Sequence, residues 1–421
     1  ASVLAIAVAV LMGCQNWDDH DRSNRYTSIE EAYNYLNSCD ANAILRTHGD
    51  NDTFPLWYAQ EVEGIRTDIR IMNTSLLGMD WYIDQMKCRS NASAPLPITL
   101  PRKDYLYGTN DFIRVVDAFG RPATAQEVMA VFTNPKFRTG SVGAIAAQTI
   151  TVPVDKEAAL ASGIVLPKDA DKMIDSLVLT MPKGTTTITK TDLILLDILA
   201  NYDWSRPICF ITRGETKLGL EPWLQFDGFV YRLVPFLNDY ADREATLDAD
   251  ALYDKLMNQC RLESLSDTSV HWDYQNIYTF TAVVPIRDIF ATTATALLER
   301  GEKEKAEALL DKCIEVMPAQ NFPYNVAQFR GINEWSLVNI VENYFHLGRP
   351  EKAIAVGDQL ADETVRTLVF YSTPTGPGPD DVLNKKLADD AASIYLYLVK
   401  LYNNFGQKEA AAALEEKLKN A

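Results

Sequence analysis

The chain has 421 residues, of which 47% are hydrophobic and 23% charged, proportions ordinary for a folded protein of two or three domains. Forty basic residues against 57 acidic ones leave a formal net charge of −17, and no segment concentrates Lys and Arg. Because affinity for nucleic acid rests largely on neutralising phosphates, this balance argues against nucleic acid as a partner. The six cysteines lie far apart without a C-x-x-C pair, so neither a zinc site nor a disulfide framework is indicated.

The first 14 residues form an apolar stretch without a charge. As a helix this stretch spans about 20 Å, which is short of the roughly 30 Å hydrocarbon core of a membrane. In one interpretation, residues 1–14 are the end of a transmembrane helix that begins upstream. In the other, L-M-G-C is a lipobox that ends a signal-like segment, and Cys14 carries a lipid. Both interpretations place the following residues at a membrane surface.

A dense polar juncture, W-D-D-H-D-R at 17–22, follows the apolar stretch. His and Asp can bind metals, but consecutive residues cannot all point at one ion. We therefore expect a solvated membrane juncture, where the amphipathic ring of a tryptophan is favoured. The residues assigned to it are Trp17, Asp18, His20 and Arg22.

Residues 15–240 predict an α/β domain, a small mixed sheet with flanking helices. Ser28 and Glu31 form a capping box that opens a helix through Leu36. The apolar run 43–45 predicts a strand, and a polar loop follows it. The aromatic stretch 54–63 then predicts a helix closed by Gly64, and the apolar run 65–77 predicts the next strand.

The polar loop therefore falls at the carboxyl end of a strand and the amino end of a helix, where open α/β folds bind ligands. Its D-N-D sequence at 50–52 has a spacing that can hold a divalent cation, the one cofactor considered. The structural alternative makes Asp52 or Thr53 the N-cap of the helix. No nucleophile or phosphate-loop motif appears, so neither catalytic residues nor metal ligands are assigned. The residues expected to contact a ligand or partner are His48, Asp50, Asn51, Asp52, Thr53, Trp57 and Gln60.

The remainder of this domain alternates between clear and weak signals. Residues 81–87 predict a short helix, whereas about 100–185 predict an irregular insertion with a few strands, such as 149–154 and 176–181. Thr189 and Asp192 predict a capped helix that ends near Asn201. Further strands are expected at 208–212 and 229–234.

Residues 241–421 predict an all-α domain of tetratricopeptide-like repeats. In three segments a helix ends at a glycine, which suits the left-handed conformation, and an alanine follows five residues later in the next helix. The spacings of 47 and 58 residues between these glycines exceed the standard of about 34, so long inserts must separate the hairpins, and a generic helical bundle stays the alternative. The glycine and alanine pairs are Gly301 and Ala306, Gly348 and Ala353, and Gly406 and Ala411.

Three segments carry a family resemblance: N-W-D-D-H-D-R-S at 16–23, G-D-N-D-T-F-P-L-W-Y-A-Q-E-V-E-G-I-R-T-D at 49–68 and N-T-S-L-L-G-M-D-W-Y at 73–82. They resemble the carboxyl-terminal half of a bacterial polytopic membrane-protein family of unknown function. That family is similar to a eukaryotic transmembrane protein O-mannosyltransferase with a tetratricopeptide-like luminal tail. The resemblance implies that residues 1–13 end the last membrane helix and that the rest, including the α/β domain 15–240, is extracytoplasmic (periplasmic). It also implies that catalysis belongs to a membrane-embedded part of the protein outside these 421 residues.

The expected function is that of an accessory region in a glycosyltransferase-like membrane protein. It would position an acceptor polypeptide or a lipid-linked sugar, with the membrane-embedded part of its own chain as partner. The alternative is a periplasmic or surface lipoprotein whose helical repeats act as a protein-binding scaffold. An autonomous soluble enzyme would need a catalytic site that the sequence does not display.

Overall fold

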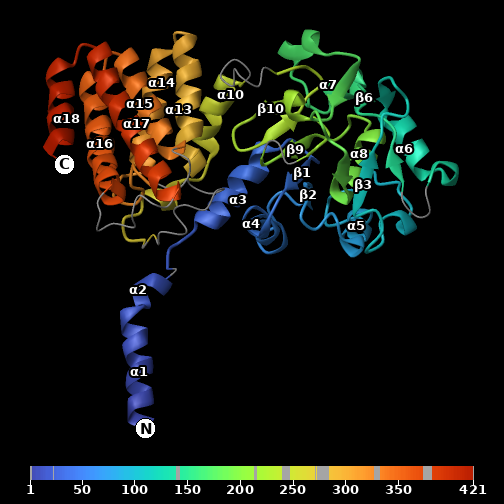
Figure 1. The fold of residues 1–421 in the computed structure, drawn as a ribbon, viewed down its shortest axis with the longest axis horizontal. Coiled ribbons are helices and arrows are strands. Elements are labelled where there is room, and N and C mark those ends of the chain that lie inside the picture. The colour runs from blue at the N-terminus through green and yellow to red at the C-terminus, as the bar shows by residue number, and fades with distance from the viewer. Residues whose placement is uncertain are drawn as a thin grey trace. The chain divides into compact units, whose positions relative to one another are not determined.

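The computed structural model describes residues 2–21, 23–138, 143–212, 216–238, 247–270, 272, 284–326, 332–372 and 382–420. It contains two compact units, residues 31–248 and residues 1–30 with 249–421 (Figure 1). The first holds mixed β-sheets with helices, and the second is helical in its described residues. This confirms an α/β part followed by an all-α part.

A five-stranded mixed sheet organises the unit 31–248, in the order β10-β11-β9-β1-β2. The buried strand β1 pairs in parallel with β2 and with β9, and these strands lie side by side (Figure 1). β11 runs antiparallel to β9 and to β10. Parallel neighbours bring the carboxyl ends of β1, β2 and β9 to one edge of the sheet. The bounds are β1 (Ile44–Thr47), β2 (Arg70–Asn73), β9 (Ile208–Phe210), β10 (Leu224–Phe226) and β11 (Tyr231–Leu233).

Each predicted helix beside this sheet is present, but two begin earlier than expected. α4 begins at Asp50, and α3 begins at Thr27, so Ser28 lies inside the helix and is not its N-cap. Thr189 accepts the N–H of Asp192 and Asp192 accepts the N–H of Thr189, so the predicted capping box opens α8. Gly64 has φ +68, in the left-handed region, and lets Ile65 donate its N–H to the carbonyl of Ala59. The bounds are α3 (Thr27–Ser38), α4 (Asp50–Glu61), α5 (Asp80–Met86) and α8 (Lys190–Ala200).

Residues 100–185 are more regular than the sequence predicts. They contribute to two further three-stranded sheets, β5-β3-β8 and β4-β6-β7, and the latter contains both strands expected there. The helix α6 was missed although Thr124 and Glu127 form a complete capping box before it. The bounds are β3 (Phe112–Val115), β4 (Ala123–Thr124), α6 (Ala125–Thr133), β5 (Ala144–Ile145), β6 (Thr149–Pro153), α7 (Lys156–Ala161), β7 (Ser176–Thr180) and β8 (Thr187–Thr189), with 3₁₀ turns at 102–104, 135–137, 167–172 and 221–223.

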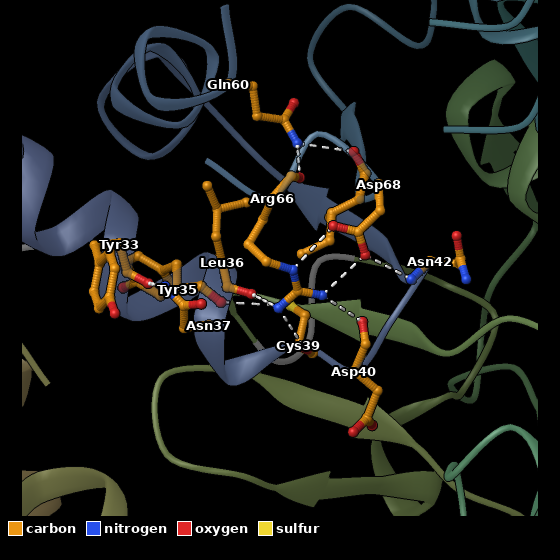
Figure 2. Close-up of polar contacts among 11 residues, drawn as sticks. Tyr33, Tyr35, Leu36, Asn37, Cys39, Asp40, Asn42, Gln60, Arg66 and Asp68 are labelled. Carbon is orange, nitrogen blue, oxygen red and sulfur yellow. Dashed lines mark hydrogen bonds and ion pairs between the residues drawn. The ribbon is translucent and has the colours of Figure 1, made fainter. Parts of the chain in front are cut away.

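Arg66 joins the end of α3 to the approach to β2 (Figure 2). Its guanidinium donates to both carboxylate oxygens of Asp68, at 2.9 and 3.0 Å. The same group donates to three backbone carbonyls that follow one another around the end of α3, at 2.9–3.0 Å. Such a bidentate, charge-assisted arrangement fixes the guanidinium plane, so Arg66 acts as a structural clamp. The carbonyls belong to Leu36, Cys39 and Asp40.

This clamp makes stability depend on pH. The hydrogen bonds from Arg66 lower the pKa of Asp68 below its ordinary 3.8. A lowered folded-state pKa contributes stability above the unfolded value, and this contribution is lost as pH falls from about 4 through the folded pKa. We therefore expect Asp68→Asn to be less stable than the parent at pH 6, with the difference shrinking toward pH 2.5. Urea midpoints across this range measure it. An equal difference at all pH values would contradict the assignment, and the exposed Asp117→Asn is the control.

The second unit is built from helical hairpins. Gly301, Gly348 and Gly406 have φ between +72 and +79, so each closes a helix in the left-handed conformation as predicted. The three alanines that follow are buried in the next helices. Pairs α13 and α14, α15 and α16, and α17 and α18 pack against each other. The bounds are α10 (Ala249–Asp254), a π-helical turn (Lys255–Gln259), α11 (Glu263–Ser266), α13 (Val284–Glu299), α14 (Lys303–Val316), α15 (Ile332–His346), α16 (Pro350–Ser372), α17 (Val382–Asn404) and α18 (Lys408–Asn420).

The apolar amino terminus is helical, as α1 (Ser2–Gln15), and is followed by the short α2 (Trp17–His20). None of the 14 residues of α1 is buried, and Cys14 is exposed. Within the described residues, no helix combines the length and the apolar character that crossing a bilayer requires.

Candidate functional site

The polar loop lies where the sequence places it, at the carboxyl end of β1, but much of it is helix. α4 begins at Asp50 with Gly49 as its N-cap, four residues before the predicted start. Asp52 is therefore the third residue of the helix and not its N-cap. Its buried carboxylate reaches back to accept the N–H groups of His48 (2.7 Å) and Gly49 (2.8 Å). Glycine has no side chain with which to cap, but the carboxylate of Asp52 holds the backbone just before the helix and complements the helix dipole.

The side chain of Thr53 is also held inside the fold by hydrogen bonds. Its buried hydroxyl shares a 2.7 Å hydrogen bond with that of Thr47, the last residue of β1. It also accepts from the amide of Asn73, the last residue of β2, at 3.0 Å. This network ties α4 to the ends of two parallel strands. Asp52 and Thr53 are therefore supports of the loop, and neither is offered to solvent.

Three loop residues remain exposed to solvent: His48, Asp50 and Asn51. A ring nitrogen of His48 lies 3.2 Å from the hydroxyl of Thr74, which orients the imidazole. Asp50 and Asn51 occupy the first two positions of α4, beside N–H groups that have no partner within the helix. The exposed surface of the loop thus combines an imidazole, a carboxylate and an amide at the positive end of a helix dipole.

Trp57 and Gln60 belong to a different place. Both line a pocket of about 530 Å³ beside β2, the edge strand of the five-stranded sheet. The amide nitrogen of Gln60 donates to the carbonyls of Arg66 (2.7 Å) and Ile69 (2.9 Å), so its side chain is held against the segment that leads into β2. The seven predicted residues therefore fall into two groups, one at the end of β1 and one in the pocket.

The pocket also contains residues that the sequence did not single out as functional. Trp81 and Gln85 come from α5, Arg70 comes from β2, and Arg89 comes from the segment after α5. The one available signal was weak: Trp81 lies in the family-like segment 73–82, but nothing local indicates that it lines a pocket with Trp57. The two tryptophans come together because β2 carries the chain from α4 to α5.

A divalent-cation site gains no support from the loop. Asp52, one half of the D-N-D pair, already accepts two backbone N–H groups. Across the ranges that the structure describes, no three His, Cys, Asp or Glu side chains gather in a way that could hold a metal ion.

Comparison with protein families identifies the domain that contains the loop and the pocket. A family model described as TMEM260-associated domain 2 matches residues 28–251, more than half of the chain. The chain belongs to this family. Comparison with curated proteins and with solved structures finds no match.

The TMEM260-associated domain corresponds closely to the structural unit 31–248 and ends before the hairpins that begin with α13. It contains both the loop at the end of β1 and the pocket beside β2. The match links the chain to the TMEM260 family, which is consistent with the resemblance to a eukaryotic transmembrane protein.

The predicted membrane juncture lies before the TMEM260-associated domain. Trp17 is 72% exposed, and His20 is exposed with its ring nitrogen donating to the carbonyl of Asn16 at 2.9 Å. The side chain of Asp18 and the whole of Arg22 lie outside the described residues. An interfacial role for these residues stays a prediction.

Proposed function

We propose that the chain is the extracytoplasmic accessory region of a glycosyltransferase-like membrane protein of the protein O-mannosyltransferase type. The observation that supports this is the match to TMEM260-associated domain 2, which agrees with the resemblance of the sequence to a transmembrane protein O-mannosyltransferase. The region positions an acceptor polypeptide or a lipid-linked sugar. The catalytic residues belong to the membrane-embedded part of the same protein, which is its first partner.

In this proposal α1 is the end of the last membrane helix, and the bulk of the chain is periplasmic. The support is the apolar, unburied surface of α1 and the exposed Trp17 that follows it. The 14 residues of α1 extend about 21 Å, so further apolar residues are needed to complete a span.

A second candidate function is a scaffold that holds another envelope protein. It is favoured by the three glycine-closed hairpins, which resemble tetratricopeptide repeats in their turn glycine and their buried alanine. In that case α1 is a signal-like segment and Cys14 the lipidated residue. Mass spectrometry of the protein isolated from membranes separates the two: diacylglyceryl-modified Cys14 as the first residue supports the scaffold lipoprotein and contradicts the accessory region.

The test of the accessory role is the triple variant His48→Ala, Asp50→Ala, Asn51→Ala in the full-length membrane protein. These side chains are exposed, so stability should change by no more than about 1 kcal/mol, mainly through the lost carboxylate at the helix amino end. If the loop contacts acceptor or donor, glycosylation of the acceptor should fall about tenfold or more, as read by mass spectrometry of the acceptor.

Two matched variants complete this test. Asp117→Ala removes an exposed carboxylate of the same domain outside the loop and should leave glycosylation unchanged. Asp52→Asn should instead lower stability by about 1–2 kcal/mol, because it weakens the acceptor of two N–H groups. Unchanged glycosylation by a folded triple variant would remove the loop from the proposed function.

A further inference from the structure

The pocket beside β2 has aromatic walls that keep part of their surface exposed. Trp81 on α5 is 51% exposed, and Trp57 on α4 is half-buried and stacks on Phe54 with ring centroids 5.5 Å apart. Large aromatic side chains stabilise a fold most when they are buried. Two tryptophans that line one 530 Å³ pocket and keep accessible surface are typical of a binding site, whose volume commonly lies between about 300 and 1,000 Å³.

The polar groups of the pocket include planar amides and carboxylates. Gln85 and Asn91 are exposed, and the amide of Asn91 donates to the carboxylate of Glu61 at 2.7 Å. A ligand that matches such walls has an apolar face for the tryptophan rings and hydrogen-bonding groups around its edge. A sugar ring has this distribution, with C–H groups on its face and hydroxyls around its perimeter.

The charge of the pocket points to one more group on the ligand. Arg70 is only 3% exposed, and burial lowers its pKa. One of its nitrogens donates to the carbonyls of Gln85 (2.7 Å) and Cys88 (2.8 Å), while Nε and Nη1 have no hydrogen-bond partner in the structure. A buried cation held by neutral carbonyls, with donors left over, is stabilised by an anion.

The carboxylates that line the pocket are already engaged. Asp84 accepts from Arg102 at 2.9 Å and from the hydroxyl of Tyr105 at 2.7 Å. Glu61 accepts from Asn91, as described above. Of the two cationic groups that line the pocket, Arg89 is exposed and open to a ligand, whereas the buried guanidinium of Arg70 contributes its charge.

We propose that the pocket between α4 and α5 binds a glycosyl phosphate. Trp57 and Trp81 lie against the sugar ring, the exposed Arg89 binds the phosphate, and the buried charge of Arg70 adds to its attraction. The role of the pocket in holding the sugar of a donor rests on the function proposed above. Binding of a glycosyl phosphate, however, can be measured on this chain alone, so the pocket proposal and the proposed function can fail independently. Loss of glycosylation in the loop variant does not depend on the pocket.

The experiment is isothermal titration calorimetry of the 421-residue chain with mannose, mannose 1-phosphate and inorganic phosphate as probes. Mannose 1-phosphate should bind about tenfold or more tightly than either fragment, because it fills both parts of the pocket. A short-chain polyprenyl mannosyl phosphate as fourth probe distinguishes a lipid-linked source from a free one. Binding of the two phosphosugars with equal affinity assigns the site to the shared glycosyl phosphate group.

The variants separate the two parts of the pocket. Trp81→Ala removes a half-exposed side chain and should weaken mannose 1-phosphate about tenfold or more, with an unchanged melting temperature. Arg89→Ala should weaken mannose 1-phosphate but leave mannose alone. Tyr107→Ala is the matched control, since this tyrosine is 84% exposed and does not line the pocket.

Four results would overturn the proposal. These are the absence of heat with every sugar probe at millimolar concentration, equal affinity for inorganic phosphate and mannose 1-phosphate, binding that survives Trp81→Ala, and tighter binding of a nucleoside monophosphate than of mannose 1-phosphate. The last would assign the tryptophans to a base. Arg70→Lys is included only if its melting temperature matches the parent, because its guanidinium also holds two backbone carbonyls.

Discussion

Arg287→Ala is expected to lower the free energy of unfolding of the helical unit by about 3–5 kcal/mol. Arg287 lies in α13 with 1% of its surface exposed, and burial lowers its pKa. Its terminal nitrogens donate to four oxygens at 2.7–3.3 Å, so one side chain joins α13 to the segment after α14 and to the start of α15. Alanine leaves those buried acceptors unsatisfied and opens a cavity. The acceptors are the carbonyls of Met317, Phe322 and Pro323 and the amide oxygen of Asn333.

Two controls isolate this effect. Arg287→Lys keeps the charge but cannot reproduce the planar fork, so it should lose most of the same stability. Arg300→Ala removes a half-exposed arginine just after α13 and should cost no more than about 1 kcal/mol, since its ion pairs are at the surface. Urea unfolding gives the free energies, and hydrogen exchange of peptides from 284–346 localises the change. A loss for Arg287→Ala no larger than that for Arg300→Ala would contradict the role assigned to Arg287.

The elements that could be predicted are those whose signals are local. The Thr189 and Asp192 pair opens α8 as expected, because a capping box needs only four consecutive residues. The turn glycines at 301, 348 and 406 were readable for the same reason. The start of α4 could not be predicted in this way. Gly49 offers no side chain, and the acceptor for its N–H sits three residues inside the helix, where Asp52 looks like an N-cap by composition.

The candidate site, too, could be predicted only where its signals are local. The loop at the end of β1 was predictable in position, because an α/β unit places the strand end and the helix start together. That Trp57, Arg70 and Trp81 line one pocket could not be predicted, because it depends on β2 being an edge strand. Edge position is set by strand order over the whole sheet, including β9 from more than 130 residues later. No local pattern of residues carries that information.

Gly219→Ala is expected to destabilise the unit 31–248 by about 3–5 kcal/mol. Gly219 has φ +75, a conformation that costs alanine about 1–2 kcal/mol. A Cβ atom at this position would also lie 2.2 Å from the carbonyl oxygen of Thr180, at the end of β7. That oxygen is backbone and cannot rotate away. Leu218 and Leu220 are buried on either side of the glycine, so the segment cannot shift outward without exposing them.

Gly184→Ala separates the clash from the conformational strain. Gly184 also has a left-handed φ, +87, but no heavy atom lies within 4 Å of a Cβ atom built there. Its substitution should therefore cost only the strain, about 1–2 kcal/mol. Urea unfolding of both variants, with hydrogen exchange of peptides from β6 and β7, gives the comparison. If the two substitutions cost the same, β7 and the 216–220 segment are not in backbone contact. If Gly219→Ala costs more by about 2 kcal/mol, that contact holds the second three-stranded sheet to the chain that leads into β10.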